Sequence, residues 1–466
     1  MSPDRRHFIR NITLGTGAIV SGIQTAKSNT QNDALSKKSS FNMCGYAAPK
    51  IEKVRIGFVG LGHRGPAAVN RISFIEGVEI KALCDKIPDR VDAAQKILTG
   101  KGLPSARSYT GENGWKAMCE SSDLDLIYIC TPWSLHTPMA VYAMQHGKHA
   151  ASEVPIAVTI DECWQLVETS EKTRKHCMML ENCCYDFFEL LTLNMARNGL
   201  LGELIHAEGA YLHDLLDSNF NKTGYADMWR LRENIHLKGN LYPTHGLGPI
   251  AQCLNINRGD KMNHLVSVST NDFMMGEKAK EKAKEDPFYN QFVDKPYNGN
   301  MNTTVIRTDK GKTIMLQHDV TSPRPYSRIH LVSGTKGIAS KYPAPERIAF
   351  GHEWIKPEEL QKLYEQYTPP IVKKVGEIAK QVGGHGGMDF MMDWRLIDCL
   401  RNGLPLDQDV YDGALWSSIG PLSGASVAQR SGSVNIPDFT RGNWRTNKPV
   451  NLTLDGGGTT TVRSVK

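Results

Sequence analysis

A glycine-rich segment directly after an apolar run is the feature of this chain that most restricts its fold. Gly60-Leu61-Gly62-His63-Arg64-Gly65 follows the apolar run Val54–Val59 and opens a stretch with helical spacing. A second apolar run ends at Asp85, 20 residues after Gly65. Glycines with this spacing permit a tight turn, close approach of a pyrophosphate, and close packing of a helix on a strand. The pattern predicts a βαβ unit that binds a dinucleotide, with Gly60, Leu61, Gly62, His63, Arg64 and Gly65 forming its loop.

The acidic side chain of Asp85 indicates which dinucleotide this unit would bind. At the end of the second strand, its carboxylate would accept hydrogen bonds from the adenosine ribose hydroxyls and repel a 2′-phosphate. N–H groups at the start of the helix would bind the phosphates. We therefore expect NAD rather than NADP.

Short apolar runs alternate with helix-length segments up to about residue 184. We expect strands at Val54–Gly60, Val78–Asp85, Leu124–Thr131, Lys148–Val154 and Met178–Cys183, with helices such as Pro88–Leu98 and Leu135–Gln145 between them. Strands that are apolar nearly throughout are typical of a parallel sheet covered on both faces. The fold class is α/β, with an N-terminal Rossmann dinucleotide-binding domain over residues 51–184.

Beyond residue 184 the expected strands follow one another with little helix between them. They lie at Leu204–Leu212, His264–Ser269, Asn302–Arg307, Thr313–Asp319 and Arg328–Ser333. This order predicts an α+β substrate-binding domain with a largely antiparallel open sheet over residues 185–445, and a tail over 446–466. The mixed charges of Glu277–Glu285 indicate a solvated helix. An exposed face of such a sheet would offer a surface for a homodimer.

The first 50 residues have the order of an export signal. Arg5 and Arg6 precede a modestly apolar stretch from Ile12 to Ile23, and a polar spacer continues to Lys50. The paired arginines resemble the twin-arginine type, whose passengers cross the membrane folded. We expect a periplasmic or other extracytoplasmic protein. A disordered basic tail is the alternative, because glycines interrupt the apolar stretch.

Charge, hydropathy and cysteine usage exclude several classes of protein. Residues 1–50 carry +5 of the net charge of +6, so the other 416 residues are almost neutral and nucleic-acid binding is not expected. No apolar run approaches the roughly 18 residues of a membrane-spanning helix. The ten cysteines are irregularly spaced without a Cys-x-x-Cys pair, so we predict no disulfide framework, no catalytic thiol and no metal site.

Two further strand ends should face the same crevice as the glycine loop. Trp133, Ser134, Leu135 and His136 follow one of these strands, and Glu153 and Val154 end the other. Ligands of such sheets bind outside the carboxyl ends of the strands. Trp133 and His136 could therefore flank the nicotinamide half, although each alone is more often a packing residue.

These motifs resemble the glucose-fructose oxidoreductase and inositol dehydrogenase (Gfo/Idh/MocA) superfamily from about residue 53 to 440. The likeness lies in the glycine loop, Thr131-Pro132 with His136, Glu153-Val154-Pro155 and the spacing of Gly239 from His245. The sugar dehydrogenases of that superfamily carry a lysine where Val154 stands and usually an acid where Leu241 stands. An ordinary dehydrogenase without both groups would be poorly equipped to deprotonate its substrate.

At the positions where it differs from those sugar dehydrogenases, the chain closely resembles a narrower group, glycoside hydrolase family 109, typified by α-N-acetylgalactosaminidase. The likeness rests on Asn240-Leu241-Tyr242-Pro243-Thr244-His245-Gly246, Glu181-Asn182-x-x-Tyr185 and Gly386-Gly387-Met388-Asp389-Phe390. The resemblance implies an NAD-dependent glycosidase that cleaves terminal α-linked N-acetylgalactosamine from a glycan or glycoside.

The resemblance also implies the residues that bind and react. NAD contacts would fall on His63, Arg64, Asp85, Trp133, Ser134, Leu135, His136, Glu153, Val154 and Asn182. Substrate contacts would fall on Tyr211, Arg230, Tyr242, Pro243, Thr244, His245 and Tyr326. Tyr242 and His245 are the predicted catalytic residues.

The implied reaction is redox-neutral. Oxidation of the sugar C3 hydroxyl acidifies the C2 proton, elimination releases the oxygen at C1, water adds, and the hydride returns to C3. We assign His245 to the C3 hydroxyl and Tyr242 to the C2 proton, and the reverse assignment stays open. Two other interpretations stay open as well: a sugar oxidoreductase with tightly bound NAD(P), and a sugar-binding protein that retains NAD structurally.

Overall fold

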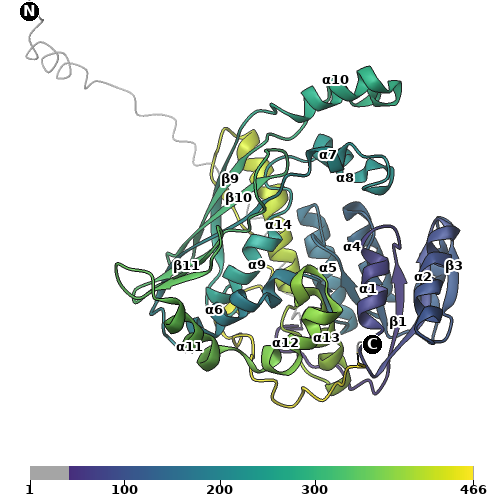
Figure 1. Cartoon of the computed structure of the whole chain (residues 1–466), viewed down its shortest axis with the longest axis horizontal. Coiled ribbons are helices and arrows are strands. Elements are labelled where there is room, and N and C mark those ends of the chain that lie inside the picture. The colour runs from purple at the N-terminus through teal and green to yellow at the C-terminus, as the bar shows by residue number, and fades with distance from the viewer. Residues whose placement is uncertain (1–40, 465–466) are drawn as a thin grey trace, which may run out of the picture. The chain divides into compact units, whose positions relative to one another are not determined.

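The computed structural model describes residues 41–464 (Figure 1). The predicted export signal and most of its spacer lie outside these residues. Within residues 41–464, no helix combines the length and the apolar composition needed to cross a membrane.

A six-stranded parallel sheet forms the first half of the described chain, in the order β3-β2-β1-β4-β5-β6. Its strands are β1 (Val54–Val59), β2 (Val78–Asp85), β3 (Arg107–Thr110), β4 (Leu126–Ile129), β5 (His149–Ser152) and β6 (Cys177–Met179). The strand order reverses between β1 and β4, and this reversal creates the crevice in which such sheets bind ligands. The predicted Rossmann fold is confirmed. Strand β3 was not predicted because its residues are polar and mostly exposed, so no apolar run marks it.

Helices connect these strands and cover the sheet. They are α1 (Arg64–Ile72), α2 (Pro88–Gly100), α3 (Gly114–Glu120), the short η2 (Trp133–Leu135), α4 (His136–Gln145) and α5 (Ile160–Thr173). Local sequence sets their starts: Pro88 occupies the first turn of α2, and the Thr159 side chain caps α5 by accepting the Glu162 N–H. The predicted helices at 88–98 and 135–145 correspond to α2 and to the end of η2 with α4.

The second sheet has eight strands in the order β13-β12-β11-β7-β10-β9-β8-β14. They are β7 (Leu204–Leu212), β8 (Met262–Ser269), β9 (Asn302–Thr308), β10 (Thr313–Asp319), β11 (His330–Gly334), β12 (Ile338–Lys341), β13 (Arg347–Ala349) and β14 (Val434–Asn435). Neighbouring strands are antiparallel except β7 and β10, which run parallel. The predicted largely antiparallel sheet is confirmed, and β12, β13 and β14 are short additions at its edges.

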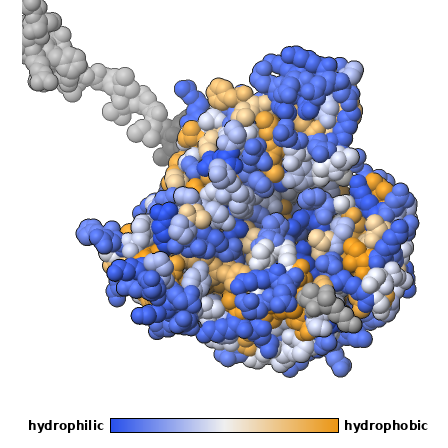
Figure 2. All heavy atoms as spheres, viewed as in Figure 1, coloured by the Kyte–Doolittle hydropathy of each residue, from blue (hydrophilic) through white to orange (hydrophobic). Residues whose placement is uncertain are grey.

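Further helices follow β6 along the chain. They are η3 (Asn182–Tyr185), α6 (Phe187–Arg197), α7 (Leu216–Asn219), η4 (Ala226–Met228), α8 (Trp229–His236), α9 (Thr244–Cys253), α10 (Met275–Glu285), η5 (Pro287–Phe292), α11 (Pro357–Tyr367), α12 (Pro370–Val382), η6 (His385–Gly387), α13 (Met388–Asn402), α14 (Val410–Ala428) and η7 (Asn443–Arg445). Helices α9 and α14 pack on the second sheet, and α13 and α14 also pack against the Rossmann domain. Helix α10 is the predicted charged helix; ion pairs such as Lys280–Glu277 lie along it, and it is hydrophilic in the space-filling view (Figure 2).

Two glycines let α9 lie unusually close to β7. A Cβ on Gly246 would lie 2.2 Å from the Ala210 nitrogen, and a Cβ on Gly209 would lie 2.5 Å from the Gly246 oxygen. Because real Cβ atoms do not approach that closely, only glycine fits at both positions. This contact fixes the start of α9 against the carboxyl half of β7.

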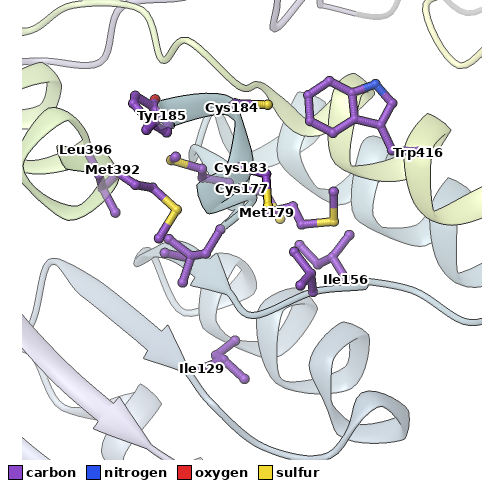
Figure 3. Packing of buried hydrophobic residues seen from close by; sticks show 14 of the residues in the cluster. Ile129, Ile156, Cys177, Met179, Cys183, Cys184, Tyr185, Met392, Leu396 and Trp416 are labelled. Atoms are coloured by element: carbon purple, nitrogen blue, oxygen red, sulfur yellow. The ribbon is translucent and has the colours of Figure 1, made fainter. Parts of the chain in front are cut away.

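The hydrophobic core is continuous between the two sheets. Side chains around β6 and η3, such as Met179 and Cys183, pack with Met392 of α13 and Trp416 of α14 (Figure 3). Sulfur atoms are common here, and all ten cysteines of the chain are free thiols. The shared core holds the two sheets as one packed body.

Candidate active site

One cavity of about 450 Å³ contains most of the predicted site residues. Its predicted lining residues are Gly60, Gly62, His63, Arg64, Asp85, Trp133, Leu135, His136, Glu153, Val154, Asn182, Tyr211, Arg230, Tyr242 and His245. Leu61, Gly65, Ser134, Pro243, Thr244 and Tyr326 do not line it. The volume lies within the range of small-molecule and cofactor sites. Both sheets therefore contribute side chains to a single site.

The glycine loop is shaped for close approach of a ligand. Gly60 has φ +88°, and a Cβ there would lie 2.7 Å from the Cys130 carbonyl carbon. A Cβ on Gly65 would lie 2.1 Å from the Gly60 oxygen, so this glycine lets α1 start directly against the strand end. Gly62 faces the cavity, and no side chain caps the N-terminus of α1. The loop thus fits a dinucleotide whose phosphates lie on the first turn of α1.

Asp85 stabilises this loop as well as facing the cavity. Its Oδ2 accepts the Leu61 N–H at 2.7 Å, and its Oδ1 accepts the Ile87 N–H at 2.9 Å. The Arg90 guanidinium lies 3.5 Å from Oδ1 and also lines the cavity. Sequence reasoning missed Arg90, although an arginine in the helical turn after Asp85 was a visible signal. Asp85 thus lies at the strand end where the predicted binding of NAD requires an acidic side chain.

One network of ion pairs and hydrogen bonds connects Glu153 and Asn182. Arg64 donates to Glu153 at 2.9 Å and to Asp389 at 3.2 Å, and the Asn182 amide also donates to Asp389. Asp389 belongs to α13 and has no exposed side-chain surface. Burial raises the pKa of Asp389, but the hydrogen bond from His385 and the Arg64 charge outweigh burial and hold it well below its ordinary value.

His136 uses both ring nitrogens inside the protein. Nδ1 lies 2.7 Å from the Pro155 carbonyl oxygen, and Nε2 lies 2.7 Å from the Thr131 carbonyl oxygen. Burial lowers the pKa of this histidine. Its ring therefore borders the cavity without a free nitrogen to offer a ligand.

Aromatic rings and one arginine form a second part of the cavity lining. The Tyr242 ring stacks on Trp133 at 5.7 Å and packs at 4.6 Å from Tyr211. The Arg230 guanidinium lies 5.0 Å from the Tyr242 ring and donates to the Tyr225 hydroxyl at 3.2 Å. Burial raises the pKa of Tyr242 well above its ordinary value, with the Tyr211 hydroxyl adding to the effect. Tyr242 is therefore a protonated phenol at neutral pH when no ligand is bound.

His245 is oriented by a buried carboxylate. Its Nδ1 lies 2.7 Å from Oε1 of Glu181, which also accepts the Cys183 N–H at 3.1 Å. Burial alone would raise the pKa of the Glu181 carboxyl. The neighbouring His245 ring and Thr244 hydroxyl outweigh burial, so this pKa lies below its ordinary value.

An ionised Glu181 fixes which nitrogen of His245 carries the proton. A carboxylate accepts hydrogen bonds, so Nδ1–H donates to it and the lone pair of Nε2 stays free. This is the arrangement of a general base. Sequence reasoning did not assign Glu181 to the site, although it directly precedes the predicted Asn182 at the end of β6.

The Glu181 and Cys183 side chains and His245 place three potential metal-ligand atoms within 4.8 Å of one another. Burial raises the pKa of the Cys183 thiol well above its ordinary value, so this sulfur is protonated and a poor ligand. The Glu181–His245 hydrogen bond accounts for the cluster, and we assign no metal to it.

The remaining predicted substrate residues lie beside the cavity. Pro243 precedes α9 and Thr244 begins it, fully buried. The Tyr326 ring packs at 6.1 Å from Tyr211 and at 5.0 Å from His213. His213 does line the cavity, and its Nδ1 lies 3.0 Å from the Tyr211 hydroxyl. Sequence reasoning missed His213, which stands two residues after Tyr211 and so projects to the same side of the chain.

Two family models match successive parts of the chain. The model described as glycosyl hydrolase 109, C-terminal domain, matches residues 185–446. The model described as the oxidoreductase family, NAD-binding Rossmann fold, matches residues 54–181.

Curated relatives match over most of their length. Glycosyl hydrolase family 109 protein 1 of Bacteroides fragilis (strain YCH46) is 51% identical over 425 residues, covering 86% of this chain and 89% of the relative. Alpha-N-acetylgalactosaminidase of Bacteroides fragilis (strain ATCC 25285) is 52% identical over 413 residues, covering 87% of this chain and 96% of the relative.

Solved structures share the fold at low sequence identity. Levoglucosan dehydrogenase in complex with NADH superposes with a TM-score of 0.61 at 17% identity, over 83% of this chain and 100% of that chain. Apo scyllo-inositol dehydrogenase from Lactobacillus casei gives a TM-score of 0.58 at 14% identity, over 83% and 99%.

Proposed function

The chain belongs to glycosyl hydrolase family 109, and on that premise we propose that it hydrolyses terminal α-linked N-acetylgalactosamine with NAD as a resident cofactor. The observation that carries the proposal is the position of His245. Its free Nε2 belongs to a ring that lines the same cavity as the glycine loop, and Glu181 holds the ring from behind. A base for a sugar hydroxyl and a dinucleotide site are thereby combined in one pocket.

When bound, NAD⁺ supplies a hydride acceptor for C3 of the sugar and returns the hydride later in the cycle. His245 is assigned to the proton of the C3 hydroxyl, because its Nε2 is the unprotonated nitrogen. Tyr242 is assigned to the proton at C2. The nearby Arg230 charge would stabilise the phenolate which that role requires. As a neutral phenol the same side chain can return a proton.

The two positions at which the sugar dehydrogenases carry a lysine and usually an acid are Val154 and Leu241 in this chain. Val154 offers no proton acceptor, and Leu241 lies buried ahead of Tyr242 and His245. The alternative is a net sugar oxidoreductase with tightly bound NAD(P). The structural likeness to dehydrogenases concerns the fold and does not favour that reaction.

A chromogenic α-N-acetylgalactosaminide tests the proposal on the protein as purified, without added NAD. We expect repeated turnovers with no net NADH, and in D₂O we expect deuterium at C2 of the released sugar. Stoichiometric NADH without cleavage would support the oxidoreductase instead. Cleavage that leaves C2 free of solvent deuterium would reject the elimination.

We also propose export by the twin-arginine route, supported by Arg5 and Arg6 ahead of the apolar stretch from Ile12 to Ile23. A cofactor that is regenerated in every turnover requires no supply outside the cytoplasm, which suits a protein exported in its folded state. Fractionation of cells that express the full chain and its Arg5→Lys, Arg6→Lys variant tests this. Unchanged localisation of the double variant would reject the route.

A homodimer is proposed through the outer face of the second sheet. Val266 and Val268 of β8 and Val305 of β9 are exposed there, and Val266 pairs directly with Val305. Exposed apolar side chains gathered on one face are typical of interaction surfaces. Light scattering of the wild-type protein and a Val266→Lys, Val305→Lys variant tests the dimer, and a monomeric wild type would reject it.

A further inference from the structure

Tyr225 lies where the glycine loop and the aromatic part of the cavity lining meet. Its ring packs at 5.6 Å from the His63 ring of the glycine loop and at 5.6 Å from the Trp229 ring. All three residues line the cavity. Tyr225 belongs neither to the predicted NAD contacts nor to the predicted substrate contacts, although it lies between His63 of the first set and Arg230 of the second.

The backbone that follows Tyr225 is strained. Asp227 and Met228 have φ of 59° and 51°, in the left-handed region that non-glycine residues seldom adopt. The Met228 N–H donates to the Tyr225 carbonyl oxygen at 2.6 Å, which closes the turn. With this turn, the side chains of Tyr225 and Arg230 both line the cavity. Backbone strain of this kind is concentrated at functional sites.

The Tyr225 hydroxyl holds the Arg230 guanidinium. Nη1 of Arg230 donates to this hydroxyl at 3.2 Å, and the guanidinium carbon lies 5.4 Å from the centre of the Tyr225 ring. The rings of Trp133, Tyr211 and Tyr242 also surround the guanidinium. A ring face attracts the cation without fixing the direction of its N–H groups. A hydroxyl acceptor does fix that direction, so Tyr225 orients the group.

One nitrogen of Arg230 is left for a ligand. The residue is 6% exposed, and its buried Nη2 has no hydrogen-bond partner among residues 41–464. A buried N–H without an acceptor is costly, so an oxygen of a bound sugar would be favoured there. Because the guanidinium is planar and rigid, the hydrogen bond that Nη1 makes also sets the direction of Nη2.

We propose that Tyr225 is a positioning residue of the sugar site, and that its hydroxyl fixes the Arg230 guanidinium so that Nη2 donates to an oxygen of the bound N-acetylgalactosamine unit. Tyr225 acts through Arg230 and not on the reacting atoms. The inference rests on the proposed function, which supplies the sugar.

The test is a double-mutant cycle on the hydrolysis of a chromogenic α-N-acetylgalactosaminide by the NAD-loaded protein. Tyr225→Phe removes the hydroxyl and keeps the ring against His63, whereas Arg230→Lys removes the planar fork and keeps the charge. We expect Tyr225→Phe to raise KM about tenfold, as for one lost hydrogen bond to a charged group, and to change kcat by less than about twofold. In the Arg230→Lys background the same substitution should change KM by less than about twofold, because the two residues act as one unit.

Tyr142→Phe is the matched control. It removes a hydroxyl that donates to Glu120 at the surface, away from the cavity, and should leave KM unchanged. The NAD content of Tyr225→Phe should equal that of the wild type, since the ring beside His63 is retained. A wild-type KM in Tyr225→Phe, or additive effects of the two substitutions, would overturn the proposal. A wild-type protein that cleaves no glycoside would reject the proposed function, and this inference with it.

Discussion

Nδ1 of His245 and Oε1 of Glu181 lie 2.7 Å apart, and the carboxylate has no exposed surface. The pair joins the start of α9 to the segment that follows β6. The second domain therefore supplies the base, His245, and Glu181 at the end of the Rossmann domain orients it. Because burial alone would favour a protonated Glu181, the contacts that keep it ionised are those that set the tautomer of His245.

Replacement of Glu181 by glutamine should reverse that tautomer. The amide can donate to Nδ1, which would place the proton of His245 on Nε2 and remove the free lone pair. We expect kcat on a chromogenic glycoside to fall about 10²–10⁴-fold, the contribution typical of general-base catalysis. NAD content should be unchanged.

The matched control is Glu358→Gln on the exposed surface of α11, which should leave kcat unchanged. A Glu181→Gln variant with wild-type kcat would show that Glu181 has no part in orienting the base.

The contact of α9 with β7 makes Gly246 sensitive to the smallest substitution. In Gly246→Ala the new methyl would lie 2.2 Å from the Ala210 nitrogen, so α9 must move away from the strand that carries Tyr211. We expect a loss of about 1–3 kcal/mol in the free energy of unfolding, as for other overpacked cores. Chemical denaturation measures this, and kcat should fall as well because His245 moves with the helix.

Gly351→Ala is the control for this substitution, since a Cβ at Gly351 meets no atom within 4 Å. Equal stability of the two variants would contradict the close packing of α9 on β7.

The parts of the fold that the sequence predicted are those in which local pattern and tertiary role coincide. For example, the local sequence alone predicts β1, the glycine loop and β2 with its terminal Asp85. Strand β3 lies at the sheet edge with polar, mostly exposed side chains, so its pairing with β2 has no local signature. The predicted strands for β4 and β6 extend too far at their carboxyl ends, because apolar residues continue beyond the paired segments.

The site divides in the same way. His245 and Tyr242 were predicted because they stand in one motif. The contact between Asn182 and Asp389 joins residues 207 positions apart, and only the packing of α13 beneath the cavity reveals it. His385 could not be placed either, since its direction depends on five successive left-handed residues.

Cofactor choice should depend on Asp85 and Arg90 together. Asp85→Ser removes the acceptor for the Leu61 N–H and leaves Arg90 without its nearby carboxylate. We expect the free energy of NAD binding to weaken by about 1–3 kcal/mol, because the ribose hydroxyls would lose the Asp85 carboxylate as their acceptor. The affinity for NADP should fall less, because Arg90 becomes free to bind a 2′-phosphate. Dialysis of the protein against NAD–NADP mixtures, with analysis of the bound nucleotides, measures the shift.

The control is Asp89→Ser, an exposed acid in the first turn of α2. If Asp85→Ser retains the wild-type ratio of bound NAD to NADP, Asp85 does not select the cofactor.

Stability should fall in mild acid because of histidines buried as neutral rings. Burial lowers the pKa of His330 to about 3, the Lys341 and Arg328 charges contribute, and neither ring nitrogen has a hydrogen-bond partner. The unfolded chain binds a proton near pH 6.5 that the folded ring excludes. The free energy of unfolding is therefore undiminished by His330 above pH 6.5, and it falls progressively as the pH decreases toward 3. By pH 5 this loss amounts to about 2 kcal/mol.

His330→Leu should remove this acid-induced loss of stability, because leucine can occupy the space beside the Phe188 ring and does not titrate. We expect the melting temperature of the variant to fall less between pH 7.5 and pH 5 than that of the wild type. Some decrease should persist, because burial also lowers the pKa of His176 to about 4 and of His318 to about 3. The exposed control His352→Leu should follow the wild-type curve. Parallel curves for wild type and His330→Leu would mean that His330 is not the neutral buried group on which this prediction depends.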